Sequence, residues 1–184
     1  MKITQFINAA EWLGLSKYGE HSMLVYSNLE AFREIYSHYC KIALESKNEV
    51  VLLIPHYETI STVRQTLKRE IDVPKHEVDG TLVIMDTEKA FQKSNEVYNI
   101  LLMINLLTKR AESLGKNGLS MVADAGSFFL HERLQELLKH ELSVPPELGM
   151  KCKAFCCYHK GDFNTLVEQQ KEALLDHHNR RIIL

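Results

Sequence analysis

The sequence has no long apolar run and few residues of the kinds that build special sites. Its 184 residues include four cysteines, four prolines and eight glycines. No apolar stretch approaches the ~20 residues that a membrane-spanning helix needs. The N-terminal segment is polar too, with Glu11 at the place where a signal peptide would have its apolar core. We therefore expect a cytoplasmic protein without contact to a membrane.

An excess of positive charge is also absent. The chain carries 24 acidic and 22 basic residues, so its formal net charge is -2. Its longest basic clusters are pairs, such as Lys109-Arg110 and Arg180-Arg181. A surface that binds nucleic acid normally needs a basic excess or a basic stripe. We therefore expect these pairs to lie on solvated faces, and we expect no direct contact with nucleic acid.

The few cysteines do not suggest a disulfide framework. Cys40 stands alone, and Cys152, Cys156 and Cys157 share one apolar segment, a context typical of buried, reduced thiols. A metal or thiol sensor built on Cys152, Cys156 and His159 remains an alternative, although zinc sites usually take paired ligands from a tight turn. Neighbours on a strand point to opposite faces, so Cys156 and Cys157 are not expected to share one site.

What the sequence does contain is a regular alternation of short apolar runs with longer periodic segments. The apolar runs predict strands at Ser22–Tyr26, Val50–Ile54, Leu82–Met85, Leu119–Ala123 and Lys153–Tyr158, with a possible edge strand at Arg181–Leu184. Strands that are apolar throughout are covered on both faces. With a helix between successive strands, this pattern predicts an α/β fold of three layers, doubly wound, with a mainly parallel sheet of five to six strands.

We expect residues 1–18 to form an N-terminal helix or arm and residues 19–184 to form a single domain. Ser27 begins an S-x-x-E capping box, which indicates a helix start. Ser94 and Asp162 are expected to cap two later helices.

The turn after the first strand lacks what a nucleotide-binding turn needs. A phosphate cradle uses glycines, so that backbone N–H groups can close on the anion, and usually a lysine. Here the turn is 26–30, Tyr-Ser-Asn-Leu-Glu, with neither residue type and with a carboxylate at its end. This favours a sensory or interaction module over an enzyme, and it leaves the ligand unknown.

Several segments together resemble the MEDS domain, a sensory domain of methanogen and methylotroph regulators. The resemblance is carried by residues 21–26 (HSMLVY), 43–54 (ALESKNEVVLLI), 80–86 (GTLVIMD), 156–158 (CCY) and 174–178 (LLDHH). It extends from about His21 to the C-terminus and depends on the order and spacing of these short motifs.

The resemblance implies a fold like that of RecA- and KaiC-like ATPase domains without the phosphate loop. Domains of this family are usually attached to a helix-turn-helix or a histidine kinase, whereas one α/β domain uses up this chain. The resemblance thus implies a non-catalytic, stand-alone sensory domain that acts in signal transduction or transcriptional control through a regulatory protein partner. Self-association through a sheet edge or the first helix is also possible.

Open parallel sheets bind ligands beyond the carboxyl ends of their strands. Residues at those ends, together with His21, which the resemblance marks, are our candidates for a ligand site. They are His21, Tyr26, Ser27, Asn28, His56, Asp86, Asp124, Tyr158 and His159. These residues at the carboxyl ends of the strands could bind a small molecule or a divalent metal. Alternatively, they could be polar only because loops are exposed and helix starts favour polar residues.

Two other interpretations remain open. His56, Asp86, Asp124 and His159 could serve a nucleotide-binding or ATPase-like enzyme, with Asp124 as the residue that holds magnesium. His177-His178 ends the last expected helix, where a positive imidazole interacts favourably with the helix dipole. We expect that pair to have a structural role.

Overall fold

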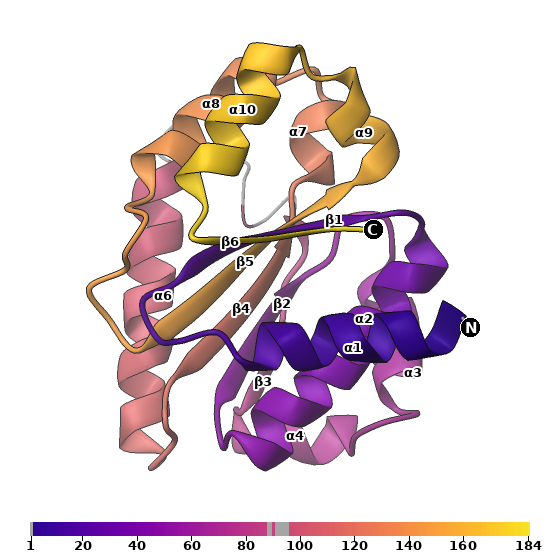
Figure 1. The fold of residues 1–184 in the computed structure, drawn as a ribbon. Helices are drawn as coiled ribbons and strands as arrows, with labels where there is room; N and C mark the ends of the chain where they lie inside the picture. Colours follow the sequence, from indigo (N-terminus) through magenta and orange to yellow (C-terminus); the bar gives the residue numbers. More distant parts are fainter. Residues whose placement is uncertain (1, 88–89, 91–95) are drawn as a thin grey trace.

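A six-stranded parallel sheet forms the centre of the molecule in the computed structural model, which describes residues 2–87, 90 and 96–184 (Figure 1). The strand order is β3-β2-β4-β5-β1-β6. The strands are β1 (His21–Tyr26), β2 (Val50–Ile54), β3 (Leu82–Ile84), β4 (Leu119–Asp124), β5 (Cys152–His159) and β6 (Arg180–Ile183). The predicted fold class is confirmed, and the expected edge strand is present.

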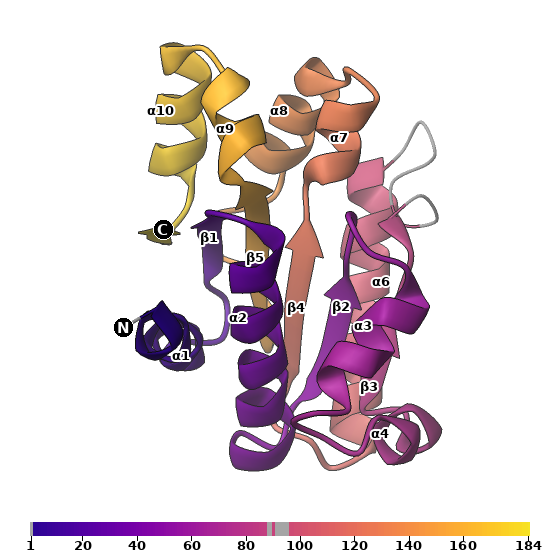
Figure 2. The same cartoon turned by 90° about the vertical axis from the view of Figure 1, so that its right-hand side faces the viewer.

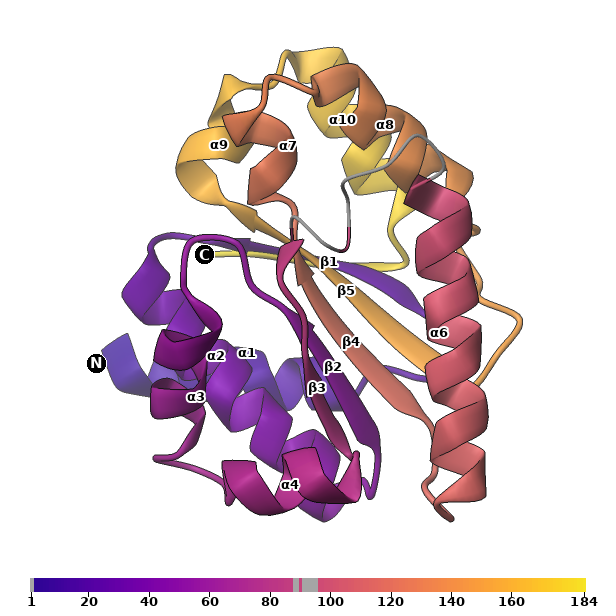
Figure 3. The ribbon, with the colours of Figure 1, turned by 180° about the vertical axis from the view of Figure 1, so that it is seen from behind.

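Helices cover both faces of this sheet, as Figures 1 and 3 show. One face carries α1 (Lys2–Gly14), α2 (Leu29–Lys41) with the π-helical turn η1 (Ile42–Ser46), α3 (Ile60–Leu67) and α4 (Val73–Asp79). The other carries α6 (Glu96–Ser113), α7 (Gly126–Leu130), α8 (Leu134–Ser143), α9 (Lys160–Thr165) and α10 (Glu168–His177). Figure 2 shows α7 to α10 gathered beyond the carboxyl ends of β4 and β5.

Side chains of successive strand residues point to opposite faces of the sheet, so the hydrophobic core has two parts, one on each face. Met23 packs into the cluster on the α6 side, and its neighbour Leu24 packs into the cluster on the α2 side. Cys156 and Cys157 divide in the same way, as the sequence predicts. All four cysteines are buried and free, which confirms that they form no disulfide framework.

The cap of α2 differs from the expected one. Asn28, not Ser27, has the extended backbone of an N-cap, and its Oδ1 accepts a hydrogen bond of 3.0 Å from the Ala31 N–H. Either residue type can cap a helix. The backbone stays extended one residue longer than the S-x-x-E pattern suggests, so the capping role moves to Asn28.

Three of the connections contain two helices where we expected one. After β2, Pro74 lies in the first turn of α4, and Asp72 caps that helix. After β4, the chain breaks between α7 and α8, where Glu132 adopts a left-handed backbone with φ 54°. After β5, Asp162 lies inside α9 and caps nothing, because the helix already begins at Lys160. The expected cap Ser94 lies outside the described residues.

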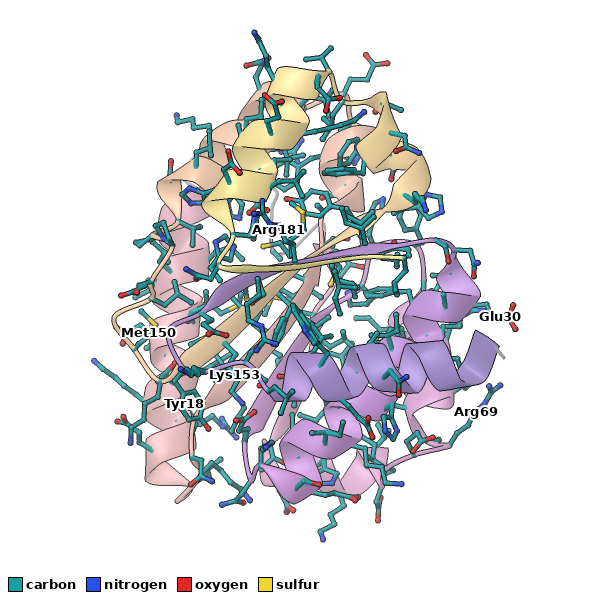
Figure 4. All side chains as sticks on the ribbon, in the orientation of Figure 1. Tyr18, Glu30, Arg69, Met150, Lys153 and Arg181 are labelled. Carbon is teal, nitrogen blue, oxygen red and sulfur yellow. The ribbon has the colours of Figure 1, made fainter. Side chains whose placement is uncertain are left out.

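A buried polar network joins the amino ends of the strands. Lys153 Nζ lies 2.5 Å from Glu49 Oε1, and Ser120 Oγ donates to Glu49 Oε2 at 2.6 Å. The Tyr18 hydroxyl donates to Glu49 at 2.7 Å, and the Lys153 ammonium lies 4.9 Å from the centre of the Tyr18 ring. Figure 4 shows Tyr18 and Lys153 at this edge of the sheet.

The opposite edge, where all six parallel strands end, lies under α7 and α9 (Figure 2).

Within the described residues, the helices lack the combination of length and apolar character that crossing a bilayer would require.

Candidate functional site

Four of the predicted site residues meet at the carboxyl edge of the sheet. The Tyr26 hydroxyl donates to Asp124 Oδ2 at 2.6 Å, which joins the ends of β1 and β4. The His159 ring lies 5.5 Å from that of Tyr26 and 5.8 Å from that of Tyr57. His56 packs edge-on against Tyr57 at 4.7 Å. Side chains from β1, β2, β4 and β5 thus form one contiguous group.

Asp124 is the central acid of this group. It is buried at the end of β4, and its second oxygen, Oδ1, accepts a hydrogen bond of 2.8 Å from the Gly126 N–H. Burial raises its pKa to about 7, because removal from water penalises the carboxylate. The hydrogen bonds from Tyr26 and Gly126 lower this pKa, because they stabilise the carboxylate, but burial has the larger effect. Asp124 therefore titrates near neutral pH.

Gly126 permits the close packing around this acid. A Cβ atom at this position would lie 2.4 Å from the His56 ring and 2.8 Å from the Tyr57 ring. Only a residue without a side chain fits there. The Tyr57 hydroxyl in turn donates a short hydrogen bond to Asp162 on α9, so the loop after β2 is tied to the helix after β5.

A cleft of about 800 Å³ opens beside this group. Its walls come from the loop after β2, from α7, from the start of α8 and from α9. It is lined by Tyr57, Phe129, Leu130, Glu132, Arg133, Leu134, Gln135, Glu136, Asp162 and Thr165. The lining combines apolar side chains from α7 and α8 with polar and charged ones, Tyr57, Arg133 and Asp162 among them, so the cleft suits a ligand with an apolar body and a polar group.

The first turn offers little to an anion. Asn28 uses its side chain to cap α2, and Ser27 Oγ lies 3.3 Å from the Asn28 amide nitrogen. The Tyr26 ring stacks on Phe32 at 4.3 Å and fills the space under the turn. Nearby, Glu58 is buried and accepts a hydrogen bond of 2.7 Å from Arg33. The Ala31 N–H group, which would otherwise be available to a phosphate, already donates to Asn28 Oδ1.

Three candidates take other positions. Asp86 follows the edge strand β3, with β2 between that strand and the one that carries Asp124, and its neighbour Thr87 has its Oγ1 3.2 Å from His56 Nδ1. Tyr158 points into the core on the α6 side, where its ring packs against Phe163 at 5.9 Å. His21, which the resemblance marks, begins β1 at the amino end of that strand and so lies apart from the residues at the carboxyl ends.

His21 instead belongs to a second, buried cluster with Glu141, Cys156 and His178. Its Nε2 lies 3.1 Å from Cys156 Sγ and 3.5 Å from Glu141 Oε2. The same Glu141 oxygen lies 3.3 Å from His178 Nε2. The ligating atoms of all four residues lie within 4.8 Å of one another.

The cysteine segment does not converge as a metal site would require. Cys152 and His159 are the first and last residues of β5, at opposite edges of the sheet, and only Cys156 joins the buried cluster. The role expected for His178 was also incomplete. Although it follows the last residue of α10, it is buried against His21, with ring centres 4.3 Å apart.

Burial and charge set the protonation of this cluster. Burial lowers the pKa of His21 to about 4, although the nearby Glu141 favours its charged form. Burial disfavours the Glu141 carboxylate, but the close imidazole of His178, 3.3 Å away, and the neighbouring rings of His21 and His140 hold its pKa well below the usual range. Burial raises the pKa of Cys156 well above that of a free thiol.

Sequence reasoning missed Glu141, Tyr57 and Asp162 as site residues. Glu141 stands within a helix of mixed polar and apolar residues, where nothing local marks it. Tyr57 adjoins the expected rim residue His56, and Asp162 was assigned to a helix cap. Positions at strand ends can be read from a sequence, whereas contacts made across helices depend on how those helices pack.

Comparison with known families agrees with this geometry. The profile described as "MEthanogen/methylotroph, DcmR Sensory domain" matches residues 20–178. The chain belongs to the MEDS family. The MEDS match covers both the carboxyl edge of the sheet and the buried cluster, so both are parts of the MEDS domain. No curated protein gives a significant match to the sequence.

A solved structure supports the fold of this MEDS domain. The chain is similar to the crystal structure of a KaiC-like protein from the hyperthermophilic archaeon Pyrococcus horikoshii, with a TM-score of 0.61 and 15% identity. The similarity covers 91% of this chain and 71% of that chain. The MEDS domain therefore has a KaiC- and RecA-like α/β fold.

Proposed function

We propose that this MEDS domain is a non-catalytic sensory module that binds a small organic molecule in the cleft between α7, α8 and α9. One observation carries the proposal: in the first strand-to-helix turn, where nucleotide-binding α/β domains hold phosphate, the side chains are engaged with other parts of the protein. Asn28 caps α2, Tyr26 stacks on Phe32, and the Tyr26 hydroxyl is bound to Asp124.

The chemistry of the carboxyl edge also favours a sensor over an ATPase. A magnesium ion needs ionised, accessible oxygen ligands. Asp124 is buried, its oxygens already accept hydrogen bonds from Tyr26 and Gly126, and its pKa is raised to about 7. Among the described residues, the cleft is lined by three carboxylates, Glu132, Glu136 and Asp162, and by one cation, Arg133, so its net charge disfavours phosphate groups.

The cleft has the properties of a site for a neutral or cationic ligand with an apolar body. Phe129, Leu130 and Leu134 provide apolar surface, and Tyr57 with Asp162 provides hydrogen-bonding groups. Because Tyr57 and Asp162 also tie the loop after β2 to α9, a ligand that competes for this hydrogen bond would alter how α9 is held. Signalling or regulatory output then passes to a protein partner.

A thermal-shift screen tests this function, with neutral and cationic organic molecules that have an apolar body in one arm and nucleotides with magnesium in the other. A ligand at a concentration 100 times its Kd adds about 2.7 kcal/mol of stability, which is seen as a rise in Tm. We expect a rise with an organic ligand and none with nucleotides.

Two matched variants locate the binding site. Leu130 lines the cleft, and Leu142 is a similarly exposed leucine on α8 that does not. We expect Leu130→Trp to abolish the ligand-induced rise in Tm and Leu142→Trp to keep it. Equal shifts in both variants would contradict binding in the cleft.

A further inference from the structure

The buried cluster of His21, Glu141, Cys156 and His178 has no role in the ligand cleft, and three of its side-chain atoms lack a hydrogen-bond partner. These atoms are His21 Nδ1, Glu141 Oε2 and His178 Nε2. Buried polar atoms are normally paired, because an unpaired one has given up its hydrogen bonds to water without replacement. Two of these three atoms face each other inside the cluster.

The hydrogen bond on the far side of His178 shows which of its nitrogens is available. His178 Nδ1 lies 2.6 Å from the Leu174 carbonyl oxygen, which can only accept a hydrogen bond. Nδ1 must therefore carry the proton, and in the neutral ring Nε2 presents a lone pair toward Glu141 Oε2, 3.3 Å away. A lone pair facing a carboxylate is unfavourable unless a positive species lies between them, and that species is either a proton, as in an ion pair of His178 with Glu141, or a metal ion.

The same hydrogen bond is the usual support of a histidine that binds a metal. Such histidines donate their other ring N–H to a carbonyl or carboxylate, which fixes both the tautomer and the orientation of the ring. His21 offers its own Nε2 to the same point, 3.5 Å from Glu141 Oε2 and 3.1 Å from Cys156 Sγ. Two imidazoles, one thiol and one carboxylate thus converge.

The spacing of these atoms fits tetrahedral coordination. Zinc bonds of about 2.0–2.3 Å at tetrahedral angles place neighbouring ligand atoms roughly 3.3–3.8 Å apart. Three of the six separations between the four ligand atoms, 3.1, 3.5 and 3.3 Å, lie close to that range, and all six are within 4.8 Å, so a metal would draw the more distant atoms inward. Charge also matches, because Zn²⁺ with one thiolate and one carboxylate is neutral, as a buried site requires.

We propose that His21, Glu141, Cys156 and His178 form a binding site for Zn²⁺ or a similar divalent transition metal. On binding, the thiol of Cys156 releases its proton to solvent and its sulfur bonds to the metal, while Glu141 binds as a carboxylate. A cavity of about 20 Å³, lined by Cys156, Glu141 and Asp124 among others, adjoins the site and is large enough for about one water.

The metal would join parts of the chain that are distant in sequence. His21 begins β1, Cys156 lies on β5, Glu141 lies near the end of α8, and His178 follows α10. A bound metal would hold α8 and α10 against the sheet. This inference does not rest on the proposed ligand cleft.

Cobalt(II) titration of the metal-free full chain tests the site, because a tetrahedral cobalt–thiolate centre absorbs strongly by charge transfer from sulfur. We expect one cobalt per chain with this band, displacement by Zn²⁺, and near-stoichiometric zinc in the purified protein. The matched variants are Cys156→Ser and Cys152→Ser, since Cys152 lies on the same face of β5 outside the cluster.

Cys156→Ser should lose the thiolate band and bind cobalt at least tenfold more weakly, whereas Cys152→Ser should behave as wild type. Because Cys156→Ser could also impair folding, circular dichroism is recorded for each variant. His178→Gln gives a second test, in which the sulfur band persists with weaker affinity. A cluster that serves only as a hydrogen-bond network would bind no stoichiometric cobalt, and that result would overturn the proposal. So would an unchanged band in folded Cys156→Ser.

Discussion

At the scale of single residues, the clearest feature is an acid held near neutral pKa at the rim of the sheet. Asp124 ends β4, where it is buried and accepts hydrogen bonds from Tyr26 and Gly126. The strand-end position of Asp124 could be predicted from the apolar run before it. Its partner Tyr26 could not, because the contact depends on β1 and β4 being separated by β5 alone.

The raised pKa of Asp124 makes stability depend on pH in a defined direction. Between its unfolded value of 3.8 and its folded value of about 7, the folded state binds the extra proton, so stability falls as pH rises through this window. We expect Asp124→Asn to remove that loss. The free energy of unfolding of the variant, taken relative to that of wild type, should therefore rise by about 2–3 kcal/mol between pH 5 and pH 8.

Urea unfolding at both pH values measures this difference, and the comparison between the two proteins cancels the contributions of other titrating groups. A variant that follows the pH dependence of wild type would contradict the assignment of Asp124.

At the scale of elements, periodicity and apolar runs predict all six strands but not the helix breaks. The strands are readable because β2 and β4, for example, are buried along their whole length. The breaks between α7 and α8 and between α9 and α10 depend on tertiary packing, and no glycine marks either of them. The second cluster was hidden for the same reason, since Glu141 reaches His21 only through the packing of α8 against the sheet.

The start of α2 offers a direct test of its corrected cap. Asn28 accepts the hydrogen bond from the Ala31 N–H, whereas Ser27 makes no bond to the backbone of this helix among those described. We expect Asn28→Ala to destabilise the protein by about 1 kcal/mol and Ser27→Ala to have little effect. Thermal and urea unfolding of the two variants decide this, and a larger cost for Ser27→Ala would restore the original S-x-x-E interpretation.

The amino edge depends on one buried ion pair. The side chains of Lys153 and Glu49 are only 5% and 1% exposed. We expect Glu49→Gln to cost about 3–5 kcal/mol, because it leaves the Lys153 ammonium buried without a countercharge. Adding Lys153→Met should recover much of the loss.

The control for this pair is the ion pair of Lys41 and Glu70, whose side chains are 42% and 32% exposed. There, Glu70→Gln should change stability by less than about 1 kcal/mol. Similar small effects at the two sites, measured by urea unfolding, would show that the buried pair does not tie the strands together.

At the scale of the whole molecule, a KaiC-like fold is combined with a first strand-to-helix turn, residues 26–30, that has neither the glycines nor the lysine of a phosphate cradle. The fold and the missing cradle can both be predicted from the sequence, since the first depends on the order of elements and the second on the residue types of one turn. The shape of the cleft beside Tyr57 and the convergence at Cys156 required the structure.

Isothermal titration of the full chain with ATP and magnesium tests the central claim most directly, which is that this domain senses without processing nucleotide. We expect no saturable heat of binding and no release of phosphate. Saturable, magnesium-dependent binding that is lost in Asp124→Ala would contradict the account and establish a nucleotide site at the carboxyl edge.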